Sequence, residues 1–256
     1  MNSIAIVTSL FSPGTDYTIE NNIIHFIHNE TDRPAWSKAL ERSYSEFGEV
    51  LDMSKNYDAQ QQAAQSNKAL QEYFGFITEK GGIILDLASG PSGYFAPALD
   101  RLQNGSVFIG SDACTTVVRA HSKANTNDNF FIIDADLDKS LPFQSGCLDV
   151  VCGNLLDNVN NYRELISEAY RCLKHGGKFA VIELFFEKDS QTYGYLMQQN
   201  AVYSSLKTYI DYCSTVGFKY LGGKILKETI GKIDKSDILP IRESDKSVVR
   251  TVYFEK

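Results

Sequence analysis

The feature that most constrains the fold of this chain is a regular alternation of short apolar runs and helical periods that begins near Gly81. The apolar runs have the length of single strands, from GGIILDL to KFAVIELFF, and each is followed by a segment with helical spacing of its apolar residues. Two parallel strands need a crossover connection between them, and that connection is usually a helix. The alternation therefore predicts an α/β fold with a doubly wound, mostly parallel sheet.

The expected elements can be placed along the chain. The expected strands are GGIILDL, SVFIGSD, NFFIID, CLDVVCG and KFAVIELFF, and the expected helices lie near Tyr94–Leu102, Thr115–Ala124, Tyr162–Leu173 and Tyr195–Val216. Two more strand-like runs follow Gly217, namely FKYLGGKIL and SVVRTVYFE, and the link between them is too short for another long crossover helix. We therefore expect an antiparallel final pair and a Rossmann-like, seven-stranded sheet with one antiparallel strand.

The first 78 residues have a different character. A short β region is followed by a helical stretch over about 35–76 that is rich in Gln, Ser and Tyr. At about 100 to 200 residues per domain, a chain of 256 residues forms one large domain with an appendage. We expect residues 1–78 to form a mainly helical lid or cap over the carboxyl edge of the sheet, and residues 79–256 to form the core.

Charge and composition exclude several classes of function. The chain has 25 Lys and Arg against 32 Asp and Glu, and its net charge of −7 repels a nucleic-acid backbone. No apolar run approaches the ~18 residues of a membrane span. No basic residue precedes the apolar run IAIVTSLF, since the first is Arg33, so a signal peptide is not indicated and a cytoplasmic protein is expected. The five cysteines form no CxxC pair, which favours reduced thiols and no metal site.

The first candidate site is the turn that follows the first strand of the alternation, with the sequence DLASGPSG. Ligands of doubly wound sheets bind at such turns, where Gly90 allows close approach of the backbone and Gly93 allows the next helix to pack tightly. Asp112 lies 22 residues beyond Gly90, at the end of the second strand, where a carboxylate can bind ribose hydroxyls. Both NAD and S-adenosylmethionine carry such a ribose. Asp86 would repel a pyrophosphate and attract an ammonium group, which favours S-adenosylmethionine.

The motifs in this region resemble those of class I S-adenosylmethionine-dependent methyltransferases. ILDLASGPSGY is similar to the first motif of that family, with Ala88 where glycine is commoner. Further similarity follows in the family's order, in FIGSD, DADLDKSLPF, LDVVCGN and YRCLKHGGKFAVIE. The resemblance covers about Gly81 to Glu183. It implies S-adenosylmethionine as cofactor, S-adenosylhomocysteine as product, and in-line SN2 transfer of the methyl group.

The resemblance also implies roles for individual residues. Asp112 would bind both ribose hydroxyls. Asp136 would accept a hydrogen bond from the adenine amino group, while the backbone N–H of Leu137 donates to a ring nitrogen. Asp134 and Asp138 are near enough in the sequence to replace Asp136 in this role. Asn154 would lie beside the methionine portion. The expected cofactor-binding set is Asp86, Ala88, Gly90, Asp112, Ala113, Asp136, Leu137 and Asn154.

The acceptor side of the site has only candidate residues. Aromatic faces hold cations and stack on flat substrates, so some tyrosines are expected to line the pocket. The candidates are Tyr44 and Tyr193 for a catalytic role and Tyr57 and Tyr195 for substrate binding. No residue stands out as a catalytic base, which is needed only when the acceptor is a neutral hydroxyl.

The functional prediction is a methyltransferase of small-molecule biosynthesis that acts on a small-molecule acceptor. One alternative is another use of the same sulfonium, by intramolecular cyclisation or aminocarboxypropyl transfer. A second alternative is a non-catalytic S-adenosylmethionine-binding module. The residues leave open whether O, N or C is methylated, and whether the protein is a monomer or a homodimer.

Overall fold

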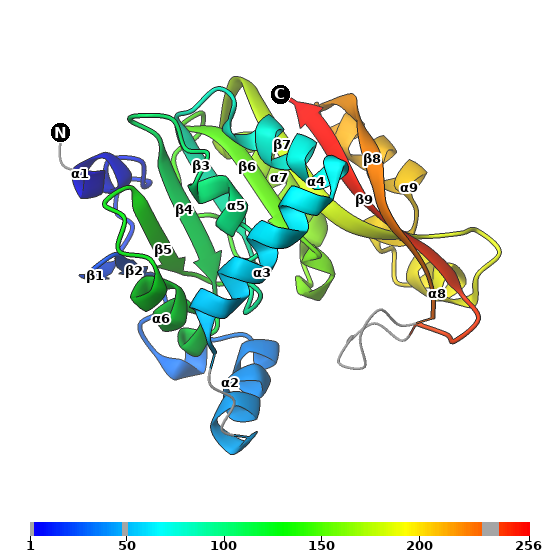
Figure 1. The fold of residues 1–256 in the computed structure, drawn as a ribbon, viewed down its shortest axis with the longest axis horizontal. Helices are drawn as coiled ribbons and strands as arrows, with labels where there is room; N and C mark the ends of the chain where they lie inside the picture. The colour runs from blue at the N-terminus through cyan, green and yellow to red at the C-terminus, as the bar shows by residue number, and fades with distance from the viewer. Residues whose placement is uncertain (1–2, 48–50, 232–240) are drawn as a thin grey trace.

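The computed structural model describes residues 3–47, 51–231 and 241–256, and a nine-stranded sheet with the order β1-β2-β5-β4-β3-β6-β7-β9-β8 runs through it (Figure 1). The strands are β1 (Thr18–Glu20), β2 (Ile23–His25), β3 (Ile83–Leu87), β4 (Val107–Asp112), β5 (Phe130–Asp134), β6 (Leu148–Asn154), β7 (Leu173–Phe186), β8 (Lys219–Ile230) and β9 (Lys246–Glu255). The helices are α1 (Ser3–Thr8), α2 (Ala35–Phe47), α3 (Met53–Ser66), α4 (Lys68–Thr78), α5 (Ala96–Leu99), α6 (Thr115–Ala124), α7 (Tyr162–Cys172), α8 (Gln191–Gln198) and α9 (Leu206–Val216).

The sheet is α/β and mostly parallel, as predicted, but the prediction of seven strands is wrong. Strands β5, β4, β3, β6 and β7 are parallel, and β9 runs antiparallel to both β7 and β8. These seven strands are the expected set. The N-terminal hairpin of β1 and β2 adds two more, because β2 pairs in parallel with β5 through Ile23 opposite Ile132. A short β region was expected in this segment, but a strand as short as Ile23–His25 carries no signal of which sheet it joins.

Helices cover both faces of the sheet (Figure 1). Side chains alternate between the two faces along each strand. Ile84 packs in the cluster that includes Phe74 of α4, whereas Leu85 packs in the cluster that includes Leu165 of α7. The apolar runs of the parallel strands are therefore buried on both sides, which is typical of an α/β sheet.

The long helix expected near Tyr195–Val216 is instead two helices, α8 and α9, joined by a short 3-10 turn. Asn200 adopts the left-handed conformation with φ at 55°, which interrupts the helix. The hydroxyl of Ser205 then accepts a hydrogen bond from the backbone N–H of Thr208 and caps α9. The polar residues between the two apolar stretches offer these local bonds in competition with a continuous helix.

The N-terminal 78 residues end with α4. Tyr73, Phe74 and Ile77 of α4 are buried against the sheet. The hairpin and α4 thus pack into the core, while α2 lies at the carboxyl ends of β4 and β5 (Figure 1). Among the described residues, none of the helices is long and apolar enough to cross a membrane.

Candidate functional site at the carboxyl edge of the sheet

The turn between β3 and α5 is built from residues in the left-handed conformation. The φ angles are 50° at Ala88, 60° at Gly90 and 63° at Gly93. A Cβ added at Gly93 would lie 2.5 Å from the ring of Tyr57, so only glycine fits there. The turn is therefore strained at Ala88, where an L side chain occupies a conformation that favours glycine.

Asp112 ties this turn to the end of β4. Its carboxylate accepts hydrogen bonds from the backbone N–H of Gly90 at 3.0 Å and of Cys114 at 2.8 Å. Burial raises the pKa of Asp112 to about 6, against the effect of these bonds, and the charge of Asp134 raises it further. One buried carboxylate therefore fixes the glycine turn against the end of β4.

Asp86 is a second buried carboxyl group, at the carboxyl end of β3. It accepts hydrogen bonds from the Ser89 hydroxyl at 2.8 Å and the Cys152 thiol at 3.6 Å. Burial raises the pKa of Asp86 to about 7, and the charge of Asp112 adds to the effect. No ion pair among the described residues involves either carboxylate. Neither carboxylate is therefore paired with a cation in the part of the chain that the structure describes.

A cavity of about 200 Å³ opens beside the glycine turn. It is lined by Trp36, Leu40, Ala88, Ser89, Gly90, Pro91, Ser92, Asp112, Asn154, Leu155 and Asn158. Four of the residues assigned to the cofactor from the sequence are in this lining, namely Ala88, Gly90, Asp112 and Asn154. Trp36 and Leu40 of α2 form part of the wall and were not anticipated, although their spacing of four residues on a helix could have indicated a shared face.

The other assigned residues lie outside the lining of this cavity. Ala113 is buried, and its carbonyl oxygen is held by the N-terminal segment. Leu137 is buried in the core. Asp136 lines a separate cavity of about 500 Å³, and its carboxylate accepts from the backbone N–H of Asp138. The structure thus places Asp136 in the lining of a different cavity from Asp112, although the backbone N–H of the preceding residue, Ala135, donates to the carbonyl oxygen of Asp112 at 3.1 Å.

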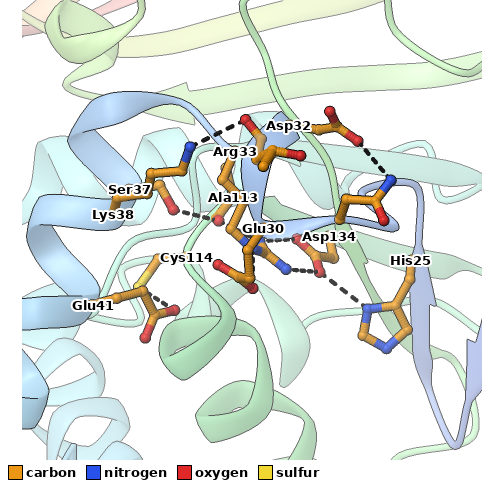
Figure 2. Close-up of polar contacts among 12 residues, drawn as sticks. His25, Glu30, Asp32, Arg33, Ser37, Lys38, Glu41, Ala113, Cys114 and Asp134 are labelled. Carbon is orange, nitrogen blue, oxygen red and sulfur yellow. Dashed lines mark hydrogen bonds and ion pairs between the residues drawn. The ribbon is translucent and has the colours of Figure 1, made fainter.

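The acid at the end of β5 is Asp134, and it is fully buried. Its carboxylate oxygens each accept a hydrogen bond from the guanidinium of Arg33 at 2.8 Å, and one also contacts His25 at 3.0 Å (Figure 2). Arg33 and His25 come from the N-terminal segment. Sequence reasoning missed this cluster because no local pattern links residues about a hundred positions apart.

Tyr57 lies behind the glycine turn, packed against Gly93. Its hydroxyl is 2.9 Å from Nδ1 of His121, and Nε2 of His121 is 2.8 Å from the carbonyl oxygen of Gly90. Burial lowers the pKa of His121 to about 4, so the ring is neutral at neutral pH. The proton then sits on Nε2, which donates to Gly90, and Nδ1 accepts from Tyr57. In this structure Tyr57 supports the turn, a placement that differs from the substrate-binding role expected from the sequence.

Two further tyrosine candidates, Tyr193 and Tyr195, are not in the lining of this cavity. Tyr193 on α8 is partly buried against the core, and Tyr195 on the same helix is 45% exposed. The side chain of Tyr44 lies outside the described part of the chain. No cluster of three or more His, Cys, Asp or Glu side chains in the described ranges is arranged to hold a metal ion.

Comparison with known families gives one match to the chain. Residues 85–181 match the model of a methyltransferase domain, and this range includes β3, β4, β5, β6 and the glycine turn. Among curated proteins, no sequence matches this chain significantly. The matched range contains every strand end that contributes to the cavity, whereas Trp36 and Leu40 precede it.

Solved structures show a similar fold. An S-adenosylmethionine-dependent methyltransferase from Mesorhizobium loti is 18% identical, with a TM-score of 0.52 over 73% of this chain and 97% of its own. Geranyl diphosphate C-methyltransferase from Streptomyces coelicolor A3(2) is 17% identical, with a TM-score of 0.54 over 72% of this chain and 77% of its own. The MccD protein is 18% identical, with a TM-score of 0.54 over 71% and 92%. These likenesses confirm the class I methyltransferase fold predicted from the motifs.

Proposed function

We propose that this protein methylates a small-molecule acceptor with S-adenosylmethionine, a function supported by the match of residues 85–181 to the model of a methyltransferase domain. The observation that carries the proposal is the pair of buried carboxyl groups, Asp86 and Asp112, on either side of the glycine turn. Burial without a cation disfavours both charges. A ligand with an ammonium group and a ribose diol supplies the missing partners.

We assign roles to the residues of the cavity on this basis. Asp112 is positioned at the end of β4 to accept from the ribose hydroxyls, and Asp86 provides the negative potential that attracts the ammonium group. Asn154, at the end of β6, would contact the methionine portion. S-adenosylmethionine supplies, when bound, a methyl group already activated by the sulfonium charge. The protein then aligns the acceptor and excludes water.

Within residues 1–78, α2 would serve as the lid of this site. Trp36 and Leu40 of α2 line the cavity together with residues of the glycine turn, and α2 comes from that segment. The similar fold of the Streptomyces enzyme, whose complex contains geranyl diphosphate, offers a precedent for a small-molecule acceptor on this fold.

The proposal is tested by binding and by turnover. Trp36 is the only tryptophan of the chain, so its fluorescence reports directly on the cavity wall. We expect S-adenosylhomocysteine to change this emission and to bind with micromolar affinity in calorimetry, whereas NAD does neither. Turnover assays with isotopically labelled methyl groups then separate methyl transfer from cyclisation, aminocarboxypropyl transfer and simple binding. Tight NAD binding without a response to S-adenosylhomocysteine would refute the proposal.

Asp112→Ala provides the matching variant. It removes a charged acceptor from a desolvated site, so we expect the affinity for S-adenosylhomocysteine to fall by about 2 to 4 kcal/mol. Asp211→Ala is the control, since Asp211 is exposed on α9 and pairs there with Lys207. Calorimetry on both variants checks the expectation. Unchanged affinity in a folded Asp112→Ala protein would show that β4 does not contribute the ribose contact.

A further inference from the structure

Arg33 makes contacts that connect the N-terminal segment to the ends of two central strands. Its side chain is about 5% exposed, and its guanidinium donates to both oxygens of Asp134 and to the carbonyl oxygen of Ala113 at 2.7 Å (Figure 2). Nε donates to Glu30 at 2.9 Å. A buried guanidinium with every donating nitrogen engaged fixes the positions of its partners.

Both partners of Arg33 adjoin Asp112. Ala113 is the next residue in the chain, and Asp134 is the register partner of Asp112 across the parallel pair of β4 and β5. Two carboxylates in register on neighbouring strands repel each other, and burial strengthens that repulsion. Arg33 neutralises Asp134, and it also holds the carbonyl of Ala113, the residue that follows Asp112.

We propose that Arg33 is a positioning residue of the cofactor site, which acts through Asp134 and the carbonyl of Ala113 to keep Asp112 ionised and in place. The inference rests on the proposed function, because it takes Asp112 as the residue that binds the cofactor ribose. It extends that function to a residue 52 positions before the matched domain begins, since the domain starts at residue 85. The N-terminal segment is then a part of the cofactor site as well as its cover.

The charged groups around Asp112 determine in which direction its pKa changes when Arg33 is replaced. The ionisable side chains linked to Asp112 directly or through a shared neighbour include Asp86 on β3, Asp134 on β5, Arg33 before α2, Glu41 on α2, Cys114 and His121 at α6, and His25 on β2, which contacts Asp134 at 3.0 Å. Burial raises the pKa of Asp112 to about 6, and the Asp134 charge adds to it. Loss of the Arg33 charge removes the cation bound to both oxygens of Asp134 and leaves His25 as the remaining side-chain contact that the structure describes there, so the repulsion between Asp134 and Asp112 grows and the pKa of Asp112 rises. Loss of the Asp134 charge has the opposite effect.

The test measures S-adenosylhomocysteine affinity by calorimetry between pH 5.5 and pH 8.5. It compares the full-length wild type with Arg33→Gln, Arg33→Lys and Asp134→Asn. Arg119→Gln is the matched control, because Arg119 is exposed on α6 and the substitution removes the same charge. Circular dichroism of each unliganded variant verifies the fold.

We expect Arg33→Gln to shift the pH at which affinity is half lost upward by about one unit, the size of effect that a neighbouring opposite charge produces. Arg33→Lys keeps the charge but not the two-oxygen contact, so it shifts the midpoint less and still weakens binding. Asp134→Asn shifts the midpoint downward, and Arg119→Gln leaves it unchanged. A role in packing alone would lower affinity by the same factor at every pH.

Two outcomes overturn the inference, namely a pH-independent loss in Arg33→Gln, or shifts in the same direction for Arg33→Gln and Asp134→Asn. If Arg33→Gln does not fold, Asp134→Asn decides the question, since an unshifted midpoint contradicts the proposal. The proposed function fails separately, when wild-type protein does not bind S-adenosylhomocysteine at any pH. Wild-type binding with unshifted variants refutes only the role of Arg33.

Discussion

At the scale of single residues, Asp86 links the function of the site to its stability. The folded protein raises the pKa of Asp86 to about 7, chiefly through burial, while the unfolded chain has an ordinary value near 4. Between these two values the unfolded state ionises before the folded one, so the contribution of Asp86 to stability falls as pH rises from about 4 to 7. Above that window the buried charge is a constant cost.

We therefore expect Asp86→Asn to stabilise the unliganded protein while it weakens cofactor binding. The gain is on the order of 1.4 kcal/mol for each unit of pKa difference that is removed, so it reaches several degrees in melting temperature at pH 8. The gain in stability falls toward zero at pH 4. Thermal unfolding at a series of pH values measures it, with Asp211→Asn on the surface as control. A gain that does not vary with pH would contradict the electrostatic explanation.

Ala88 is strained for a different reason, its left-handed backbone at φ 50°. An L residue there costs roughly 1 to 2 kcal/mol, and glycine recovers this at the expense of about 0.4 to 1 kcal/mol of unfolded-chain entropy. We expect Ala88→Gly to raise stability by up to about 1 kcal/mol. Ala120→Gly, inside α6, should lower it by about the same amount. Chemical denaturation of both variants tests the opposite signs.

At the scale of elements, α2 is attached to the sheet by residues spaced four apart. Arg33 and Ser37 hold the carbonyl of Ala113, and Glu41 accepts from the backbone N–H and the hydroxyl of Thr116 at 2.7 and 2.5 Å. Glu41 thus satisfies the first turn of α6, whose own N-cap residue, Cys114, makes no side-chain cap bond. A side chain of α2 therefore caps the N-terminus of α6.

We expect Glu41→Ala to cost about 1 to 2 kcal/mol, because it leaves an amide at a helix N-terminus without its acceptor. Hydrogen exchange should show the loss of protection in the first turn of α6 and in α2. Glu164→Ala is the comparison, since Glu164 is a glutamate in the first turn of α7 that faces solvent and should matter less. Equal effects of the two substitutions would mean that the contact between α2 and α6 contributes little.

At the scale of the whole molecule, the N-terminal segment belongs to the core as well as to the cofactor site. Ile24 of β2 is fully buried, in the cluster that also contains Ile133 of β5. We expect Ile24→Ala to destabilise the protein by about 2 to 5 kcal/mol, the range for such core truncations. Ile19→Ala on β1, at a position 45% exposed, should change stability by less than about 0.5 kcal/mol. Chemical denaturation measures both variants. Equal stabilities would show that the N-terminal segment covers the sheet without contributing to its core.

Several parts of the molecule could be predicted from the sequence because their causes are local. The strand and glycine turn around Gly90 follow from an apolar run and residues that tolerate left-handed backbone. The antiparallel pair of β8 and β9 follows from a link too short for a crossover helix. The break between α8 and α9 was missed, because Asn200 and Ser205 form their turn only through local polar bonds that compete closely with helix.

The sequence by itself determined the sheet, the turn and the position of Asp112 at the end of a strand, since periodicity and backbone conformation act over a few residues. Only the tertiary structure decided that β2 extends the sheet and that the acid after β5 is engaged by an arginine. The pair of Arg33 and Asp134 joins positions 101 residues apart. Its formation depends on how the N-terminal segment docks on the finished sheet, and no local propensity carries that information.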